Sequence, residues 1–179
     1  MFMRILGIDP GLKATGYGLI DFEKNFNKSI QLLEAGTIEP KQRDFIQERI
    51  KKIYENLDEI VLQYTPDVMV LEKLYSHYKH PTTACILGHV RGVICLLSAH
   101  RNIQLVEQSV KRIRKAIVGN GNASKLQTQR VVAHLLNIDE SKLTTDASDA
   151  LALALGYVQQ LRYRVRSVSQ ERLRQNINL

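Results

Sequence analysis

The sequence lacks long hydrophobic runs. No segment approaches 18 consecutive apolar residues, so we expect neither a membrane-spanning helix nor a membrane partner. The opening residues 1–4 lead directly into the pattern of a strand, and this leaves no room for a signal peptide. Together these absences predict a cytoplasmic protein.

Cysteine is scarce as well. Cys85 and Cys95 are the only two among 179 residues, and both lie among apolar residues of a predicted helix. We interpret them as buried free thiols in a reducing compartment, and expect neither a disulfide nor a cysteine metal site. The chain is long enough for one domain with a hydrophobic core, and its 44% hydrophobic and 24% charged residues are typical of a globular protein.

Acidic residues are outnumbered by basic ones. There are 18 of them against 25 lysines and arginines, and the net charge of +7 modestly favours a polyanionic partner. Much of this charge is local, because residues 162–179 contain five arginines and one glutamate. We therefore predict one domain at residues 1–162 and a basic tail at residues 163–179. The tail is either a disordered arm that tethers DNA or the surface end of a helix.

A short stretch near the N-terminus, residues 3–11, ends a hydrophobic strand in a carboxylate. The apolar residues before Asp9 suit a strand buried on both faces, and Pro10 ends it immediately afterwards. A carboxylate at the mouth of a buried strand is destabilising unless a cation joins it. Asp9 therefore either binds the amides of its own turn or belongs to a functional site, depending on whether other carboxylates converge on it.

Hydrophobic periodicity predicts the rest of an α/β domain. After the first strand we expect two strands, a helix, a strand, a helix and a strand, at residues 15–22, 30–38, 45–64, 67–72, 82–101 and 103–107. The first three strands are close in sequence and should pair antiparallel, whereas a helical crossover makes the fourth strand parallel to the first. Glu72, which ends the fourth strand, should then lie at the same sheet edge as Asp9.

Basic residues gather after the fifth strand. Four of five successive positions are cationic, namely Lys111, Arg112, Arg114 and Lys115. A cluster of one sign favours phosphate contact over a merely solvated helix face. The next predicted helix begins at residues 123–125, and Lys125 in its first turn is suited to contact an anion.

The last predicted helix opens with two aspartates. Asp146 and Asp149 are three positions apart and share one face, which continues through apolar residues and should pack on the sheet. Thr145 or Asp146 could cap the helix, but capping would account for only one of the two carboxylates. With Asp9 and Glu72 these acids would repel one another strongly without divalent cations, and such oxygen ligands suit Mg²⁺.

In this order and spacing, these stretches resemble the RuvC family of crossover junction endonucleases, within the RNase H-like superfamily. The resemblance spans about residues 4–160. The motifs that carry it are Gly7-Ile8-Asp9-Pro10-Gly11, Thr15-Gly16-Tyr17-Gly18, the strand ending at Glu72, Gly88-His89-Val90-Arg91-Gly92-Val93, Val118-Gly119-Asn120-Gly121-Asn122-Ala123-Ser124-Lys125 and Asp146-Ala147-Ser148-Asp149-Ala150. The resemblance implies a five-stranded mixed sheet flanked by helices, in which an antiparallel meander precedes the parallel strands.

The resemblance also implies an activity: resolution of four-way (Holliday) DNA junctions by paired symmetric nicks with 5′-phosphate products, in homologous recombination and DNA repair. It assigns catalysis and metal binding to Asp9, Glu72, Asp146 and Asp149, with two Mg²⁺ ions per site and Mn²⁺ able to substitute. Its DNA contacts fall on Tyr75, Lys111, Arg112, Arg114, Lys115 and Lys125. Arg114 departs from the family, where we expect lysine.

The partners implied are the four-way junction, a second copy of the chain joined around the helix after Glu72, and branch-migration proteins of the RuvA and RuvB type. Two other interpretations stay open. Another RNase H-like nuclease, such as one that trims ribosomal RNA precursors, opens with a similar motif, although the basic cluster and the paired aspartates favour a junction enzyme. A non-catalytic junction-binding module would bind without cutting, but buried acids without ions only destabilise a fold.

Overall fold

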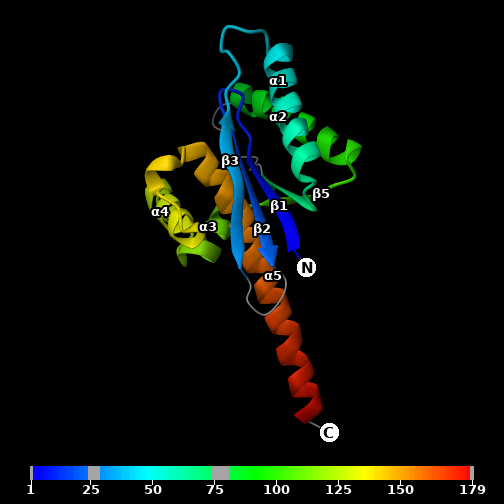
Figure 1. Cartoon of the computed structure of the whole chain (residues 1–179), viewed down its shortest axis with the longest axis vertical. Coiled ribbons are helices and arrows are strands. Elements are labelled where there is room, and N and C mark those ends of the chain that lie inside the picture. Colours follow the sequence, from blue (N-terminus) through cyan, green and yellow to red (C-terminus); the bar gives the residue numbers. More distant parts are fainter. Residues whose placement is uncertain (1, 24–28, 74–80, 178–179) are drawn as a thin grey trace.

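Five strands form one mixed sheet, in the order β3-β2-β1-β4-β5 (Figure 1). The structure is a computed structural model that describes residues 2–23, 29–73 and 81–177, with residues 81 and 164–177 described by their backbone alone. The strands are β1 (Phe2–Asp9), β2 (Thr15–Glu23), β3 (Ile30–Ile38), β4 (Val68–Glu72) and β5 (Gln104–Gln108). The first three pair antiparallel and β4 and β5 join in parallel, which confirms the predicted topology.

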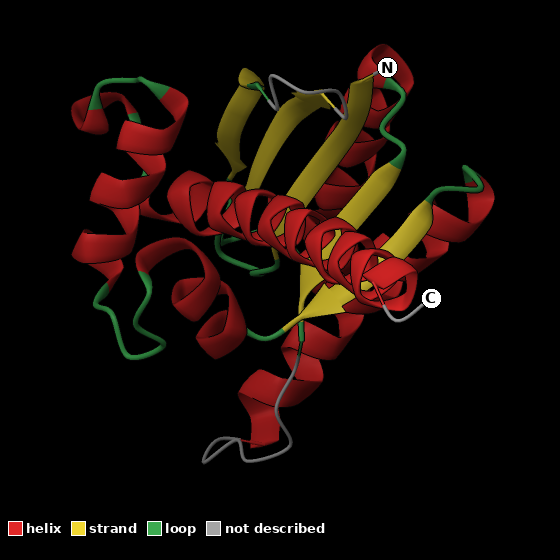
Figure 2. Ribbon diagram, turned by 90° about the horizontal axis from the view of Figure 1, so that it is seen from below, coloured by secondary structure: helices red, strands yellow, loops and turns green. Residues whose placement is uncertain are grey.

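Helices cover both faces of the sheet (Figure 2). They are α1 (Ile46–Tyr64), α2 (Pro81–His100), α3 (Val110–Val118), α4 (Lys125–Leu136) and α5 (Thr145–Ile177), with a short 3-10 helix at Glu140–Lys142. Successive strand residues point to opposite faces, so the sheet supports two separate cores. Ile5 and its neighbours pack with α3, α4 and α5, whereas Leu6 and Ile8 pack with α1 and α2.

Helix α5 lies close against β1 and β2 because glycines line its path. A Cβ atom added at Gly7 would lie 2.0 Å from the carbonyl oxygen of Ala150, and one added at Gly16 would lie 2.0 Å from the carbonyl oxygen of Asp146. Both separations are far below van der Waals contact. Only glycine at these two positions allows the first turns of α5 to rest on the strand ends.

Helix α2 buries only one of its apolar faces. Val90 and Ile94 are fully buried against the sheet and α1, whereas Leu96 is 50% exposed. Cys85 and Cys95 are also exposed, so the prediction of buried thiols is wrong. The apolar sequence around them forms an outward face that the described part of the chain does not cover.

Among the described residues, one helix is long and apolar enough to cross a membrane. Residues Thr82–His100 of α2 have a mean hydropathy of 1.5, and 28% of that segment is buried. A single such helix is weak evidence for a membrane span, because the core helix of a soluble protein satisfies the same criteria. In α2 one face, which carries the buried side chain of Arg91, packs on the sheet, and the other face is exposed.

Helix α5 continues well beyond the sheet. It crosses residue 162 without interruption and ends at Ile177, and its C-terminal part extends away from the rest of the molecule (Figure 1). The tail was predicted to be either a disordered arm or the end of a helix, and the backbone of residues 163–177 is helical. The functional division at residue 162 and DNA binding by the tail stay predictions.

Candidate active site

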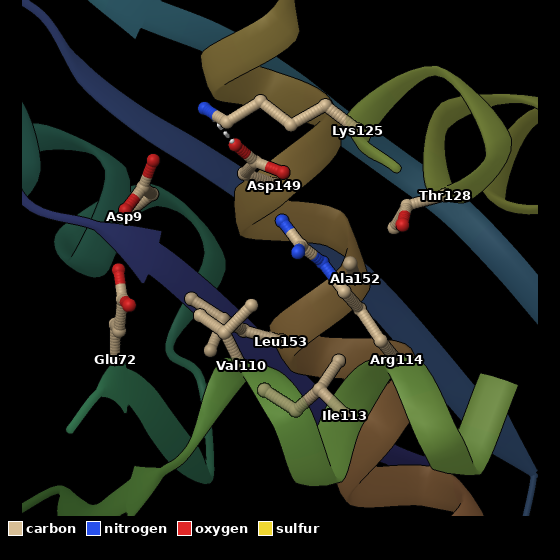
Figure 3. A pocket seen from close by; sticks show the side chains of 10 residues that line it. All are labelled: Asp9, Glu72, Val110, Ile113, Arg114, Lys125, Thr128, Asp149, Ala152 and Leu153. Atoms are coloured by element: carbon tan, nitrogen blue, oxygen red, sulfur yellow. Dashed lines mark ion pairs between the residues drawn. The ribbon is translucent and has the colours of Figure 1, made fainter. Parts of the chain in front are cut away.

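Asp9 and Glu72 end two neighbouring parallel strands. Ile8 pairs with Leu71 in the ladder, so the two carboxylates follow at the same level of the sheet. Asp9 lies two residues beyond Gly7, which α5 contacts, and therefore points to the α5 side. The two side chains face each other in Figure 3. The predicted convergence of these strand ends is confirmed.

The first turn of α5 is fixed by Thr144. Its hydroxyl accepts a hydrogen bond from the amide three residues later at 3.2 Å and bonds the hydroxyl of Thr37 on β3 at 2.7 Å. The cap is therefore Thr144 rather than Thr145 or Asp146, and neither aspartate is occupied as a cap. Asp149 is free to face the strand ends.

A cavity of about 290 Å³ lies between the strand ends and the helices. It is lined by Asp9, Glu72, Val110, Ile113, Arg114, Lys125, Thr128, Asp149, Ala152 and Leu153 (Figure 3). Since one water occupies about 30 Å³ of liquid, the space suits ions, waters and a phosphate group together. The cavity thus joins three of the four predicted carboxylates with two of the predicted cations.

Asp146 is the carboxylate that does not line this cavity. It lies one helical turn before Asp149, half-buried, where its backbone rests on Gly16. Its charge still acts at the site, because it contributes to the raised pKa of Lys125. Asp146 therefore lies next to the cavity without lining it.

Lys125 is paired with Asp149 inside the site. Ser124 and Gln127 form a reciprocal capping box that begins α4 at Lys125. From this position the Nζ atom lies 2.8 Å from Oδ2 of Asp149. The hydrogen bond to Asp149 raises the pKa of Lys125, and the charges of Asp9 and Asp146 add to the effect. The ammonium offsets part of the negative charge of the cluster.

The remaining negative charge favours the protonated form of Asp9. Burial raises the pKa of Asp9 to about 8, and the charges of Glu72 and Asp149 and a hydrogen bond with Glu72 contribute. A carboxyl group in this state holds a proton near neutral pH. The pair formed by Asp9 and Glu72 is therefore a place where a cation would replace a proton.

The donor chemistry of this cluster fits a hard divalent cation. Its carboxylate oxygens are the ligands that Mg²⁺ and Mn²⁺ prefer, and the pKa of Asp9 shows that the site favours added positive charge. Within residues 2–23, 29–73 and 81–177, no three histidine, cysteine, aspartate or glutamate side chains are close enough to hold one ion as they stand. Lys125 engages Oδ2 of Asp149, so an ion that used this oxygen would displace the lysine.

Arg114 brings a second cation into the cavity. Its Nε atom is buried and has no hydrogen-bond partner in the described part of the chain. Lys111, Arg112 and Lys115 are exposed on α3 and do not line the cavity. Tyr75 lies outside the described residues. The DNA contacts assigned to all of these residues stay predictions.

Sequence comparison identifies the family. The family model for the crossover junction endodeoxyribonuclease RuvC matches residues 5–157. A crossover junction endodeoxyribonuclease RuvC from Rhodopirellula baltica is 40% identical over 151 residues, which cover 84% of this chain and 83% of that relative. The chain belongs to the RuvC family. A RuvC from Alkaliphilus oremlandii is 39% identical over 153 residues, which cover 86% of this chain and 91% of that relative.

Solved structures of RuvC share the fold. RuvC from Thermus thermophilus matches with a TM-score of 0.80 at 22% identity, over 90% of this chain and 96% of that one. The same protein in complex with a Holliday junction substrate gives 0.80 at 20% identity with the same coverage. A yeast mitochondrial Holliday junction resolvase gives 0.68 at 15% identity, over 94% of this chain and 84% of that one. These likenesses confirm the RNase H-like fold that the RuvC resemblance predicted.

Two features that position this RuvC-type site were not predicted. Thr37 holds the cap of α5 from the end of β3, and the backbone of α5 approaches Gly7. Gly16 and Gly18, two apart on one face of the second strand, are a sequence signal compatible with the close approach of another backbone. The sequence did not reveal that the approaching segment is the helix that carries Asp149.

Proposed function

We propose that this RuvC-family chain is a crossover junction endodeoxyribonuclease that cuts four-way DNA junctions with divalent cations, in homologous recombination and DNA repair. The convergence of Asp9, Glu72 and Asp149 with Lys125 and Arg114 on one cavity supports this proposal. Metal-dependent cleavage of a phosphodiester uses both kinds of group. The carboxylates hold the metal ions, and the lysine and arginine side chains neutralise the phosphate.

Two Mg²⁺ ions per site would be held by Asp9, Glu72 and Asp149, with Asp146 joining from the preceding turn. When bound, such ions supply an activated water and stabilise the leaving 3′ oxygen. Asp9 would hold an ion as the unprotonated carboxylate, the form that burial and the charges of Glu72 and Asp149 disfavour when no cation is bound. Lys125 releases Asp149 and turns to the phosphate, while Arg114 offers two parallel donors from the cavity wall.

A second copy of the chain would cover α2. Its outward face includes Leu96 and two glycines at which an added Cβ would meet no described atom within 4 Å, namely Gly88 and Gly92. Small residues four apart allow helices to approach closely, and an exposed apolar face of this kind suits a symmetric partner. A dimer would place two active sites on one junction and produce paired nicks.

Substitution of the exposed leucine on α2 tests the dimer. We expect Leu96→Glu to convert a dimer into a monomer of 20.4 kDa in light scattering, because a charge would be buried at the interface. Leu62→Glu is the matched control, since Leu62 is similarly exposed but lies on α1. A Leu96→Glu protein that remains dimeric would remove α2 as the interface.

The activity is tested with a synthetic four-way junction in Mg²⁺, beside linear duplex and RNA–DNA hybrid controls. We expect paired nicks in the junction alone, with 5′-phosphate ends, and their loss in Asp9→Asn. Tight binding without nicks would favour a binding module, and cleavage of the hybrid would favour an RNA-processing relative. The RuvA- and RuvB-type partners rest on the family resemblance and the cytoplasmic location rests on the sequence pattern, and both stay predictions.

A further inference from the structure

We propose that Arg91 is a positioning residue that holds Glu72 in the active site from the opposite face of the sheet. This inference rests on the proposed role of Glu72 as a metal ligand. It concerns a residue of α2, outside the catalytic cavity.

Arg91 reaches the end of β4 with two donors. Its Nη1 atom donates a hydrogen bond to the backbone carbonyl of Glu72, and its Nη2 atom donates to a carboxylate oxygen of Glu107 on β5. Arg91 is only 8% exposed. A single guanidinium therefore clamps the ends of two neighbouring strands to α2.

The burial of Arg91 is poorly explained by stability alone. Burying a guanidinium is destabilising unless its partners are well placed, and an apolar side chain of similar size often serves a core as well. The partner carboxylate of Glu107 has a side-chain exposure of 47%, so water weakens the ion pair. The planar fork of arginine does offer a fixed geometry between two acceptors.

The clamp acts at the point where β4 ends. Beyond Glu72, the amide of Lys73 donates to the carbonyl of Gln108 at 2.7 Å, which extends the contact of the two strands by one residue. The side chain of Gln108 in turn bonds Gln160 of α5 at 2.9 Å. Arg91 completes this set from the α2 side, so the strand end that carries Glu72 is held by α2, β5 and α5.

The position of the Glu72 carboxylate depends on this strand end. Its carbonyl is fixed by Arg91, while its side chain points to the opposite face, toward Asp9 (Figure 3). Displacement of a ligand by about 1 Å can lower the rate of a catalysed reaction about 100-fold. Loss of the clamp should therefore weaken metal binding without touching the DNA surface.

The test compares Arg91→Met with wild-type protein on a labelled four-way junction. Methionine retains apolar length but removes both donors. We expect the Mg²⁺ concentration for half-maximal cleavage to rise about 10- to 100-fold, as for residues that orient metal ligands. Junction affinity in EDTA should stay within about twofold of wild type, because Arg91 lies outside the cavity.

Two readouts do not depend on cleavage. In metal-free protein, the amide of Lys73 should exchange hydrogen faster in Arg91→Met than in wild type. The rise in melting temperature produced by Mg²⁺ should also shrink, and should not shrink further when Arg91→Met is added to Glu72→Gln. Failure of the wild-type protein to cut would refute the proposed function, whereas the exchange at Lys73 would still report on the clamp.

Arg101→Met is the matched control. Arg101 directly follows the last residue of α2, and it pairs with Asp58 of α1 through two contacts of 2.7 Å, away from the strand ends that carry the site. It should lower the melting temperature and leave the Mg²⁺ dependence unchanged. Arg91→Lys keeps the charge in a side chain that cannot bridge both acceptors, and should show an intermediate Mg²⁺ requirement. Wild-type Mg²⁺ dependence and exchange in both Arg91 variants would overturn the proposal.

Discussion

Substitution of Gly16 by alanine should disable the site by moving α5. The new Cβ would lie 2.0 Å from the carbonyl oxygen and 2.4 Å from the carbonyl carbon of Asp146, whereas contacts between such atoms lie at about 3.5 Å. The first turn of α5 must therefore retreat from β2 by more than an ångström. Because this turn leads directly into Asp149, we expect the Mg²⁺-dependent cleavage rate to fall roughly 100-fold.

The assay is single-turnover cleavage of a four-way junction over a range of Mg²⁺ concentrations. Gly18→Ala is the comparison on the same strand, because its Cβ would first meet the side chain of Leu151 at 2.5 Å and the α5 backbone only at 3.0 Å, where the overlap is smaller than at Gly16. Overpacking there should lower stability by about 1–3 kcal/mol and leave the Mg²⁺ requirement near wild type. A folded Gly16→Ala protein with the wild-type rate and Mg²⁺ dependence would refute the reasoning.

Three further predictions concern the charges of the site. In EDTA, stability should fall by at most about 1.4 kcal/mol per pH unit as the pH rises from 3.8 to about 8, because folded Asp9 keeps a proton that the unfolded chain has lost. Thermal melts of Asp9→Asn should lack this slope, and an equal slope in both proteins would contradict the assignment. Lys125→Met should enlarge the rise in melting temperature produced by Mg²⁺, because the ammonium no longer competes for Asp149; an unchanged rise would exclude competition. Arg114→Met should lower the single-turnover rate on the order of 100-fold at saturating protein, whereas Lys111→Met should chiefly weaken junction binding and reduce its salt dependence. The reverse pattern in binding and rate assays would exchange these roles.

Much of the fold was predictable because its signals are local. Alternating and helical hydrophobic patterns, broken by proline and glycine, predicted the order and type of the strands and helices. The convergence of Asp9 and Glu72 followed from one rule, that a helical crossover makes two strands parallel and brings their ends to one edge. The patterns behind these predictions are formed by residues that lie close together in the sequence.

The arrangement around α5 was less predictable. The spacing of Asp146 and Asp149 places both on one face, but the rotation of the helix over the sheet decides which one enters the cavity. That rotation depends on the approach to Gly16 and on the bond between Thr37 and Thr144, which join distant segments. The pairing of Lys125 with Asp149 depends on the same docking.

The cysteines of α2 show another limit. Hydrophobic composition predicts burial but does not distinguish a face that packs within the chain from one that a partner covers. Cys85 and Cys95 lie on the outward face, so their apolar neighbours misled the prediction. The buried charge of Arg91 was equally hidden, because its partners come from the ends of two strands.

The central claim is that the acidic cluster at the strand ends holds divalent cations, and a crystal soaked in Mn²⁺ tests it most directly. We predict anomalous-scattering peaks between Asp9, Glu72 and Asp149, with Lys125 released from Asp149, and no such peaks in Asp9→Asn crystals. A fully soaked wild-type crystal without a peak in this cavity, with the Lys125–Asp149 pair intact, would contradict the account.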